Sequence, residues 1–154
     1  MLEAIPKNLF STGFRLQQEN RLVGEVDTSI WREKARVELE DGTYLLYREG
    51  HFSGDFILEH NGKLAARASK PSAFYNRFEV EVLGRLLILR RLSPWNRRFG
   101  LFDGDKQIGS IYPLTVFSRR AHIDLRGDWP LPIRVFLFWL VFIIWKRQSQ
   151  AAAS

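Results

Sequence analysis

Short runs in which apolar and acidic residues alternate recur along the chain at a fixed spacing. Three such runs are Val37-Glu38-Leu39, Val80-Glu81-Val82 and Ile123-Asp124-Leu125, each 43 residues after the one before. A period of two is typical of a strand with one face buried. The spacing therefore predicts one equivalent strand in each copy of a repeating unit of about 43 residues.

A second pattern repeats within the same unit. It reads Phe, any residue, Leu, then four variable positions, a basic residue and a short apolar stretch, and its copies begin at Phe14, Phe56 and Phe99. Turn-forming pairs occupy the middle of the copies: Glu19-Asn20, Asn61-Gly62 and Gly104-Asp105. Each copy predicts a β-hairpin. Two full units and most of a third give about eleven or twelve strands over residues 8–125, including one near Ile5–Phe10.

The third unit changes character where its fourth strand is due. Pro130 and Pro132 stand at the positions of Leu87 and Leu89 in the preceding unit, and proline cannot donate to a central ladder. The residues from Val135 to Trp145 are then apolar without interruption. We predict a helix over about 132–147, followed by a flexible tail at 148–154. A helix that is apolar on every side must be buried on every side.

Two environments can bury this helix. Eleven residues span only about 17 Å, against about 30 Å for the apolar core of a bilayer, so a core helix is favoured over a membrane span. A closed barrel of about twelve strands has room for a helix along its axis. We therefore expect one mainly β domain over residues 1–154, a closed antiparallel barrel enclosing a hydrophobic C-terminal helix. The alternative is a tail-anchored protein with residues 133–145 in the bilayer.

The order of these elements resembles the tubby C-terminal-like superfamily, above all its phospholipid scramblase and LURP-one-related branches. The resemblance covers about residues 8–147 and is carried by these segments: Phe99-Gly100-Leu101-Phe102-Asp103, Gln107-Ile108-Gly109-Ser110-Ile111, Ala121-His122-Ile123-Asp124-Leu125 and the apolar run from Val135 to Trp145. It implies a twelve-stranded barrel around a C-terminal helix. Tubby domains bind phosphoinositides through basic side chains, but no individual ligand of theirs matches a position here. The Cys-rich and acidic calcium segments of scramblases have no counterpart.

Composition narrows the possible chemistry. The chain has no Cys, which excludes disulfide frameworks, thiolate metal sites and thiol nucleophiles. Its histidines, His51, His60 and His122, lack the spacing of paired metal ligands, and we interpret them as surface imidazoles. No catalytic motif is present. We therefore expect a non-enzymatic protein without metal or cofactor.

Basic residues concentrate in the second half of the chain. Residues 1–81 carry 11 Lys and Arg against 13 Asp and Glu, whereas residues 82–154 carry 12 against 4. Such asymmetry suggests an anionic partner. The candidate contacts are Trp95, in a Ser-Pro-Trp-Asn turn, and the four arginines that flank this turn, Arg90, Arg91, Arg97 and Arg98. Arg119 and Arg120 are a candidate extension. Arg next to Trp suits binding to an acidic phospholipid surface, so we expect peripheral binding to anionic headgroups.

Other interpretations of this segment remain open. It can be a solvated turn whose Trp95 packs on the barrel rim, or the protein can be an intracellular scaffold for a protein partner. Nucleic acid is less favoured, because most aromatic residues fall on inward positions of the predicted strands, as Phe14, Phe56, Phe78 and Phe99 do. The first residues lack the basic and apolar regions of a signal peptide. We expect a cytoplasmic protein, peripheral at the membrane.

Overall fold

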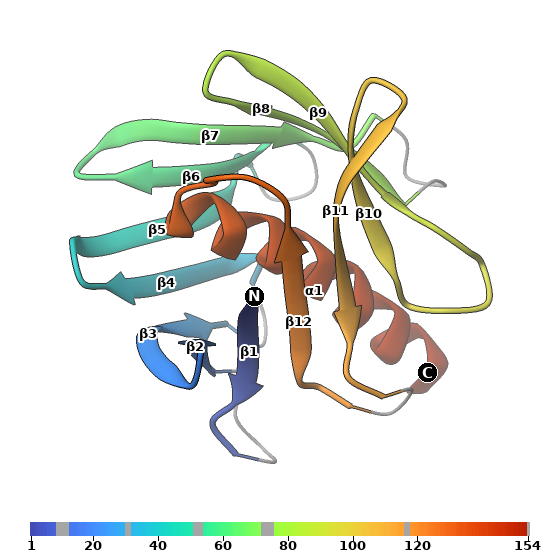
Figure 1. Ribbon diagram of the computed structural model, residues 1–154, viewed down its shortest axis with the longest axis horizontal. Coiled ribbons are helices and arrows are strands. Elements are labelled where there is room, and N and C mark those ends of the chain that lie inside the picture. Colours follow the sequence, from blue (N-terminus) through green and yellow to red (C-terminus); the bar gives the residue numbers. More distant parts are fainter. Residues whose placement is uncertain (9–12, 30–31, 51–53, 72–75, 116–117, 154) are drawn as a thin grey trace.

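The computed structural model describes residues 1–8, 13–29, 32–50, 54–71, 76–115 and 118–153. They form twelve strands and one helix (Figure 1). The elements are β1 (Leu2–Pro6), β2 (Phe14–Gln18), β3 (Arg21–Thr28), β4 (Lys34–Leu39), β5 (Gly42–Arg48), β6 (Phe56–His60), β7 (Lys63–Ser69), β8 (Arg77–Val82), β9 (Arg85–Arg91), β10 (Phe99–Asp103), β11 (Lys106–Pro113), β12 (Ala121–Leu125) and α1 (Leu131–Ala153).

The strands close into a barrel in which every neighbour in sequence is a neighbour in space. Each strand pairs antiparallel with the next, and β1 closes the ring by pairing with β12 from Leu2↔Ile123 to Ala4↔Ala121. The predicted fold class is confirmed. The first strand was predicted near Ile5–Phe10 but runs over Leu2–Pro6, because Leu2 and Ala4 supply the inward face that seals the ring. Residues 9 and 10 of the predicted first strand lie outside the described residues.

The internal repeat is visible in the backbone. The ladders of the three repeated hairpins shift register directly after Leu16, Leu58 and Leu101, the third residue of each copy. A bulge bends a strand and increases its twist, so it sets the curvature of the barrel at three equivalent places. The three predicted turns are confirmed as two-residue connections.

One position of the repeating unit is glycine in the first and third copies and alanine in the second. The pairing of its strand with the next strand differs accordingly. Gly24 pairs with Leu39 and Gly109 with Leu125. A methyl group on Gly109 would lie 2.8 Å from the main-chain oxygen of Asp124, closer than real contacts. In the middle copy this position is Ala66, and the pairing of β7 with β8 stops one residue short of it. A groove opens there on the outside of the barrel.

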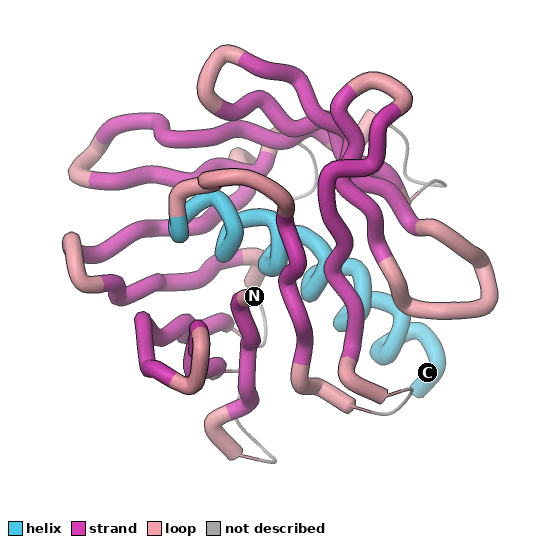
Figure 2. The backbone as a smooth tube through the Cα atoms, in the orientation of Figure 1, coloured by secondary structure: helices cyan, strands magenta, loops and turns pink. Residues whose placement is uncertain are grey.

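The helix α1 runs through the ring of strands (Figures 1 and 2). Its residues from Val135 to Val141 are all buried, and aromatic rings of separate strands contact it. Phe14 of β2 meets the ring of Phe138 edge-on at 5.1 Å, and Phe56 of β6 meets that of Trp139 at 5.8 Å. The apolar run is therefore helical and buried in the core, as predicted. In the described part of the chain, no helix combines the length and hydropathy needed to cross a membrane.

Both ends of α1 extend past the predicted bounds. Pro132 occupies its first turn, where the missing N–H costs nothing. At the other end the helix continues to Ala153, so residues 148–153 are helical and do not form the separate tail that was predicted. Gln148 to Ala153 contain no proline or glycine that would end the helix.

The two ends of the barrel differ in their connections. At one end, which we call the short-turn end, five two-residue turns join the strands and the segment 126–130 leads into α1. At the other, the long-loop end, the connections run over 7–13, 29–33, 49–55, 70–76, 92–98 and 114–120. Because the strands alternate in direction, all six lie at the same end. The C-terminal part of α1 emerges there, since Trp145 Nε1 donates a hydrogen bond to the Arg97 carbonyl at 3.0 Å.

Candidate anion-binding site

Charge separates along the barrel axis. Seven basic and three acidic residues stand in the long-loop connections: Lys7, Arg32, Lys70, Arg97, Arg98, Arg119 and Arg120 against Glu33, Glu49 and Asp55. The short-turn connections hold one basic and five acidic residues: Arg126 against Glu19, Glu40, Asp41, Asp105 and Asp128. Lys146 and Arg147 of α1 add to the basic end. Four further basic residues, Arg21, Lys63, Arg85 and Lys106, directly follow the short turns and offset the acids there. The excess of basic residues therefore lies at the long-loop end, which carries the candidate residues.

The sequence has a further regularity in the same six connections. Each of the six contains an aromatic residue, whereas none of the five two-residue turns does. These aromatic residues are Phe10, Trp31, Phe52, Phe74, Tyr75, Trp95 and Phe117. Only Trp95 among them is a described residue. The site that follows accordingly includes Trp95 alone.

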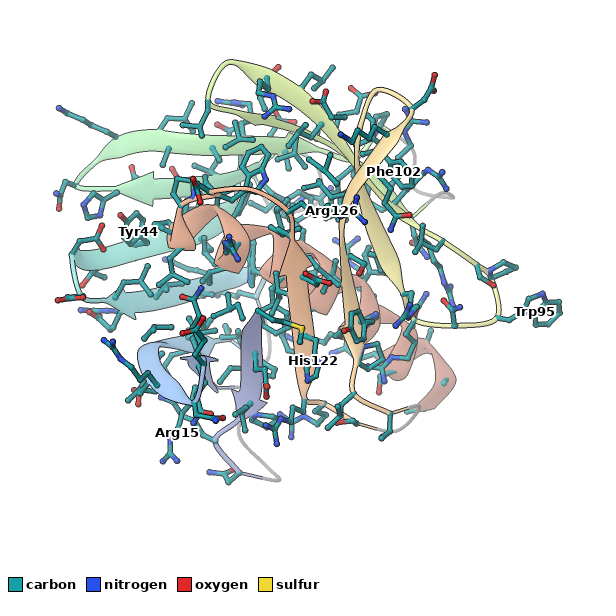
Figure 3. The ribbon with its side chains drawn as sticks, in the orientation of Figure 1. Arg15, Tyr44, Trp95, Phe102, His122 and Arg126 are labelled. Carbon is teal, nitrogen blue, oxygen red and sulfur yellow. The ribbon has the colours of Figure 1, made fainter. Side chains whose placement is uncertain are left out.

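Trp95 stands at the tip of the 92–98 loop and is 92% exposed. Figure 3 shows its side chain directed away from the barrel. The loop beneath it is held by its own hydrogen bonds: Trp95 N donates to Ser93 Oγ at 3.1 Å, and Arg98 N donates to Asn96 Oδ1 at 3.0 Å. The alternative in which Trp95 packs on the barrel rim is wrong. An ordered loop presents a bare indole to its surroundings.

Two of the candidate arginines stabilise the loop instead of facing outward. Arg91 follows Leu87 and Leu89 on the inward register, and at the rim its guanidinium donates to the main-chain oxygens of Pro94 and Asn96, at 3.2 and 2.9 Å. Arg97 lies over the Trp145 ring at 4.7 Å and donates to the Ser118 carbonyl. Burial lowers the pKa of Arg97.

Two others lie over aromatic rings at the outer surface. The guanidinium of Arg90 is 4.1 Å from the Phe102 ring centre, and that of Arg98 is 4.2 Å from the Tyr112 ring centre. Both residues are exposed. A ring covers one face of a guanidinium and leaves its other face and its N–H edges open. Arg90 and Arg98 are thus placed and oriented without being neutralised.

The extension at 119–120 divides in the same way. Arg120 is paired with Glu3 across the β12–β1 seam, with its Nε 3.0 Å from Glu3 Oε2. Arg119 is exposed and donates to the Asn8 carbonyl at 3.4 Å. The structure therefore brings Trp95, Arg90, Arg98 and Arg119 to the outer surface of one barrel end. It assigns structural contacts to Arg91, Arg97 and Arg120.

The histidines contribute to packing. His60 stacks on Tyr44 with ring centres 4.0 Å apart, and His122 lies 5.4 Å from the Tyr112 ring. Both are half-buried, so they are less exposed than expected: His60 stacks on the buried Tyr44 of the core, and His122 covers Tyr112. His51 lies outside the described residues. Within the described ranges, no three His, Asp or Glu side chains gather as metal ligands would.

Comparisons with protein-family models, with curated proteins and with solved structures gave no match to this chain.

Proposed function

We propose that this protein is a non-enzymatic binding module that associates peripherally with anionic phospholipid surfaces through the long-loop end of its barrel. The observation that carries the proposal is Trp95, a large aromatic side chain held in the open by an ordered loop and flanked by Arg90 and Arg98. The proposal agrees with the resemblance to tubby-like and scramblase-like barrels and places the protein in the cytoplasm, peripheral at the membrane.

The physical chemistry of this end suits an acidic bilayer. Indole rings settle at the level of the headgroups, and each basic residue near such a surface is worth about 1 kcal/mol. Arg90, Arg98 and Arg119 therefore supply weak attraction that falls as salt rises. The long-loop end carries the larger excess of positive charge, so it would face the membrane as the protein approaches.

A protein-interaction scaffold is the second candidate, and the groove beside Ala66 favours it. Three exposed leucines line that groove, Leu64, Leu83 and Leu86, at the end opposite Trp95. In the tail-anchored alternative α1 would have to leave the barrel, and Phe138 and Trp139 would then lose their contacts with the rings of Phe14 and Phe56.

The test is co-sedimentation with vesicles of phosphatidylcholine containing about one-third phosphatidylserine, over a series of salt concentrations. We expect the wild type to bind at low salt and to be released as salt rises. The double variant Arg90→Ser/Arg98→Ser should bind less at every salt concentration. Trp95→Ala should also bind less but keep the salt dependence of the wild type, because its contribution is apolar.

The matched control removes two exposed arginines from the short-turn end, Arg21→Ser/Arg126→Ser, for the same change in net charge. It should bind vesicles as the wild type does. Equal losses of vesicle binding in both double variants would mean that only the net charge of the protein matters, which would contradict the proposal. So would preferential binding to a single-stranded oligonucleotide added as competitor.

A further inference from the structure

A pocket of about 280 Å³ opens at the long-loop end, between the C-terminal half of α1 and the strands β3 and β4. Its volume lies just below the range for small-molecule sites, about 300–1,000 Å³. Eleven described residues line it: Thr28, Ser29, Arg32, Glu33, Lys34, Trp139, Phe142, Ile143, Lys146, Arg147 and Gln150. The lining has an apolar part and a strongly cationic part, and none of the arginines of the 92–98 loop belongs to it.

The apolar part comes from the inner helix. Trp139, Phe142 and Ile143 contribute their side chains to the wall. Trp139 and Ile143 are nearly fully buried, whereas Phe142 is only half-buried. Phe142 also packs edge-on against Phe14 of the core at 5.1 Å. The pocket is therefore continuous with the hydrophobic interior of the barrel.

The cationic part exceeds what its acid can neutralise. Four basic residues line the pocket, and among its described lining residues Glu33 is the only acid. Glu33 is itself held by two arginines, Arg147 through Nε at 2.9 Å and Arg48 at 3.4 Å. The net charge of the lining is thus positive by three. Arg32 and Lys34 are exposed, whereas Lys146 and Arg147 are partly buried beside the apolar wall, so the pocket offers an anion several cations of which one acid neutralises only a part.

One cation is positioned to bind such an anion. Lys146 Nζ donates one hydrogen bond to the Ser29 carbonyl at 2.7 Å, and an ammonium group has three donors. Burial lowers the pKa of Lys146, and the pKa of nearby Lys70 is lowered by burial and then by Arg147 and Arg48. The lowered pKa of Lys146 comes from burial alone, since the charge of Glu33 acts to raise it, whereas the lowered pKa of Lys70 includes the effect of neighbouring positive charge.

We propose that this pocket binds a single-chain anionic amphiphile of the fatty-acid type. The carboxylate would lie among Lys146, Arg32 and Lys34, and the first methylene groups would lie along Phe142 and Ile143. Neither a fully polar anion nor an uncharged apolar molecule matches both parts of the lining. The proposal does not rest on membrane association, because the ligand is a monomer in solution and the pocket residues are separate from Trp95, Arg90 and Arg98.

The experiment is calorimetric titration of the full chain with acetate, hexanoate, octanoate and decanoate, each below its micelle concentration. Affinity should rise about fourfold for each added methylene group that becomes buried, and acetate should show no measurable binding. Octylammonium, which has the octanoate chain length and the opposite charge, should not bind.

Two variants locate the site. Arg32→Gln/Lys34→Gln removes two exposed pocket cations and should weaken octanoate binding about five- to tenfold. Lys63→Gln/Lys106→Gln removes the same charge from exposed strand starts at the short-turn end and should leave it unchanged. Absence of decanoate binding, equal binding of octylammonium, or equal losses in the two variants would overturn the proposal. Vesicle binding by the same protein would stand or fall separately.

Discussion

The close approach at Gly109 provides the sharpest test of how this barrel is packed. Replacing Gly109 with Ala adds one methyl group, which would meet the Leu125 side chain and lie 2.8 Å from the Asp124 carbonyl oxygen. The backbone of Gly109 is extended and accepts any residue, so the conflict is one of space. Because the nearest backbone belongs to β12, the strand itself must move.

The expected magnitude follows from two opposing effects. Forcing an extra methyl group into a packed region costs about 1–3 kcal/mol, while Ala lowers the entropy of the unfolded chain relative to Gly and returns about 0.4–1 kcal/mol. We therefore expect the free energy of unfolding to fall by about 1–2 kcal/mol. For a domain of this size that lowers Tm by roughly 2–8 °C.

Urea unfolding followed by tryptophan fluorescence measures this loss, and amide hydrogen exchange shows where it falls. In Gly109→Ala the β11–β12 pairing should end one residue early, as β7–β8 does beside Ala66. The reciprocal change, Ala66→Gly, should slow exchange in residues 64–66 as the pairing extends. A Gly109→Ala protein with unchanged stability and exchange would refute the explanation of the groove.

Three further outcomes are expected. Leu83 is 66% exposed and has a φ of 51° before Gly84, a backbone conformation that is strained for leucine. Asparagine suits this turn, so Leu83→Asn should raise the free energy of unfolding by about 1 kcal/mol in the same urea titration. A lower free energy of unfolding would contradict the idea that Leu83 is strained. Deleting residues 133–154 removes the core helix and should leave an aggregating or unfolded chain. Cooperative unfolding of the truncated protein would show that the barrel does not need the helix, which contradicts this prediction. Burial and the hydrogen bond to Asp41 raise the pKa of Tyr44 to about 12; since the unfolded chain ionises near pH 10, stability should fall from pH 10 to pH 12 by up to about 2 kcal/mol, and Tyr44→Phe should fall less over that interval.

The elements of this fold were predictable because their signals are local and repeated. Alternation around Val37, Val80 and Ile123 depends only on which face of a strand is buried. The apolar run that starts at Val135 has no polar side to leave in water, which requires an enclosing structure. Closure through Leu2 was less visible, because a five-residue strand that starts with the second residue carries little pattern of its own.

The site was predictable in outline only. The sequence places Arg91 and Arg97 in the same basic segment as Arg98, but whether a guanidinium faces solvent depends on register at the rim and on what lies inside the barrel. Arg97 meets Trp145, 48 residues away in the chain, and no spacing rule predicts that contact. The separation of charge between the two ends could have been found by sorting residues according to the alternating short and long connections.

The enclosed helix imposes an order of events on the growing chain. α1 is synthesised after every strand, yet Phe14 and Phe56 need it as their packing partner. The first strand likewise waits for β12, since Leu2 pairs with Ile123. Contacts over such separations form slowly, and the partly made sheet exposes its inner face and one open edge meanwhile. The inner faces of the strands thus stay uncovered from the synthesis of β2 until α1 is complete, and a chaperone that holds extended apolar chains would protect them over that whole period.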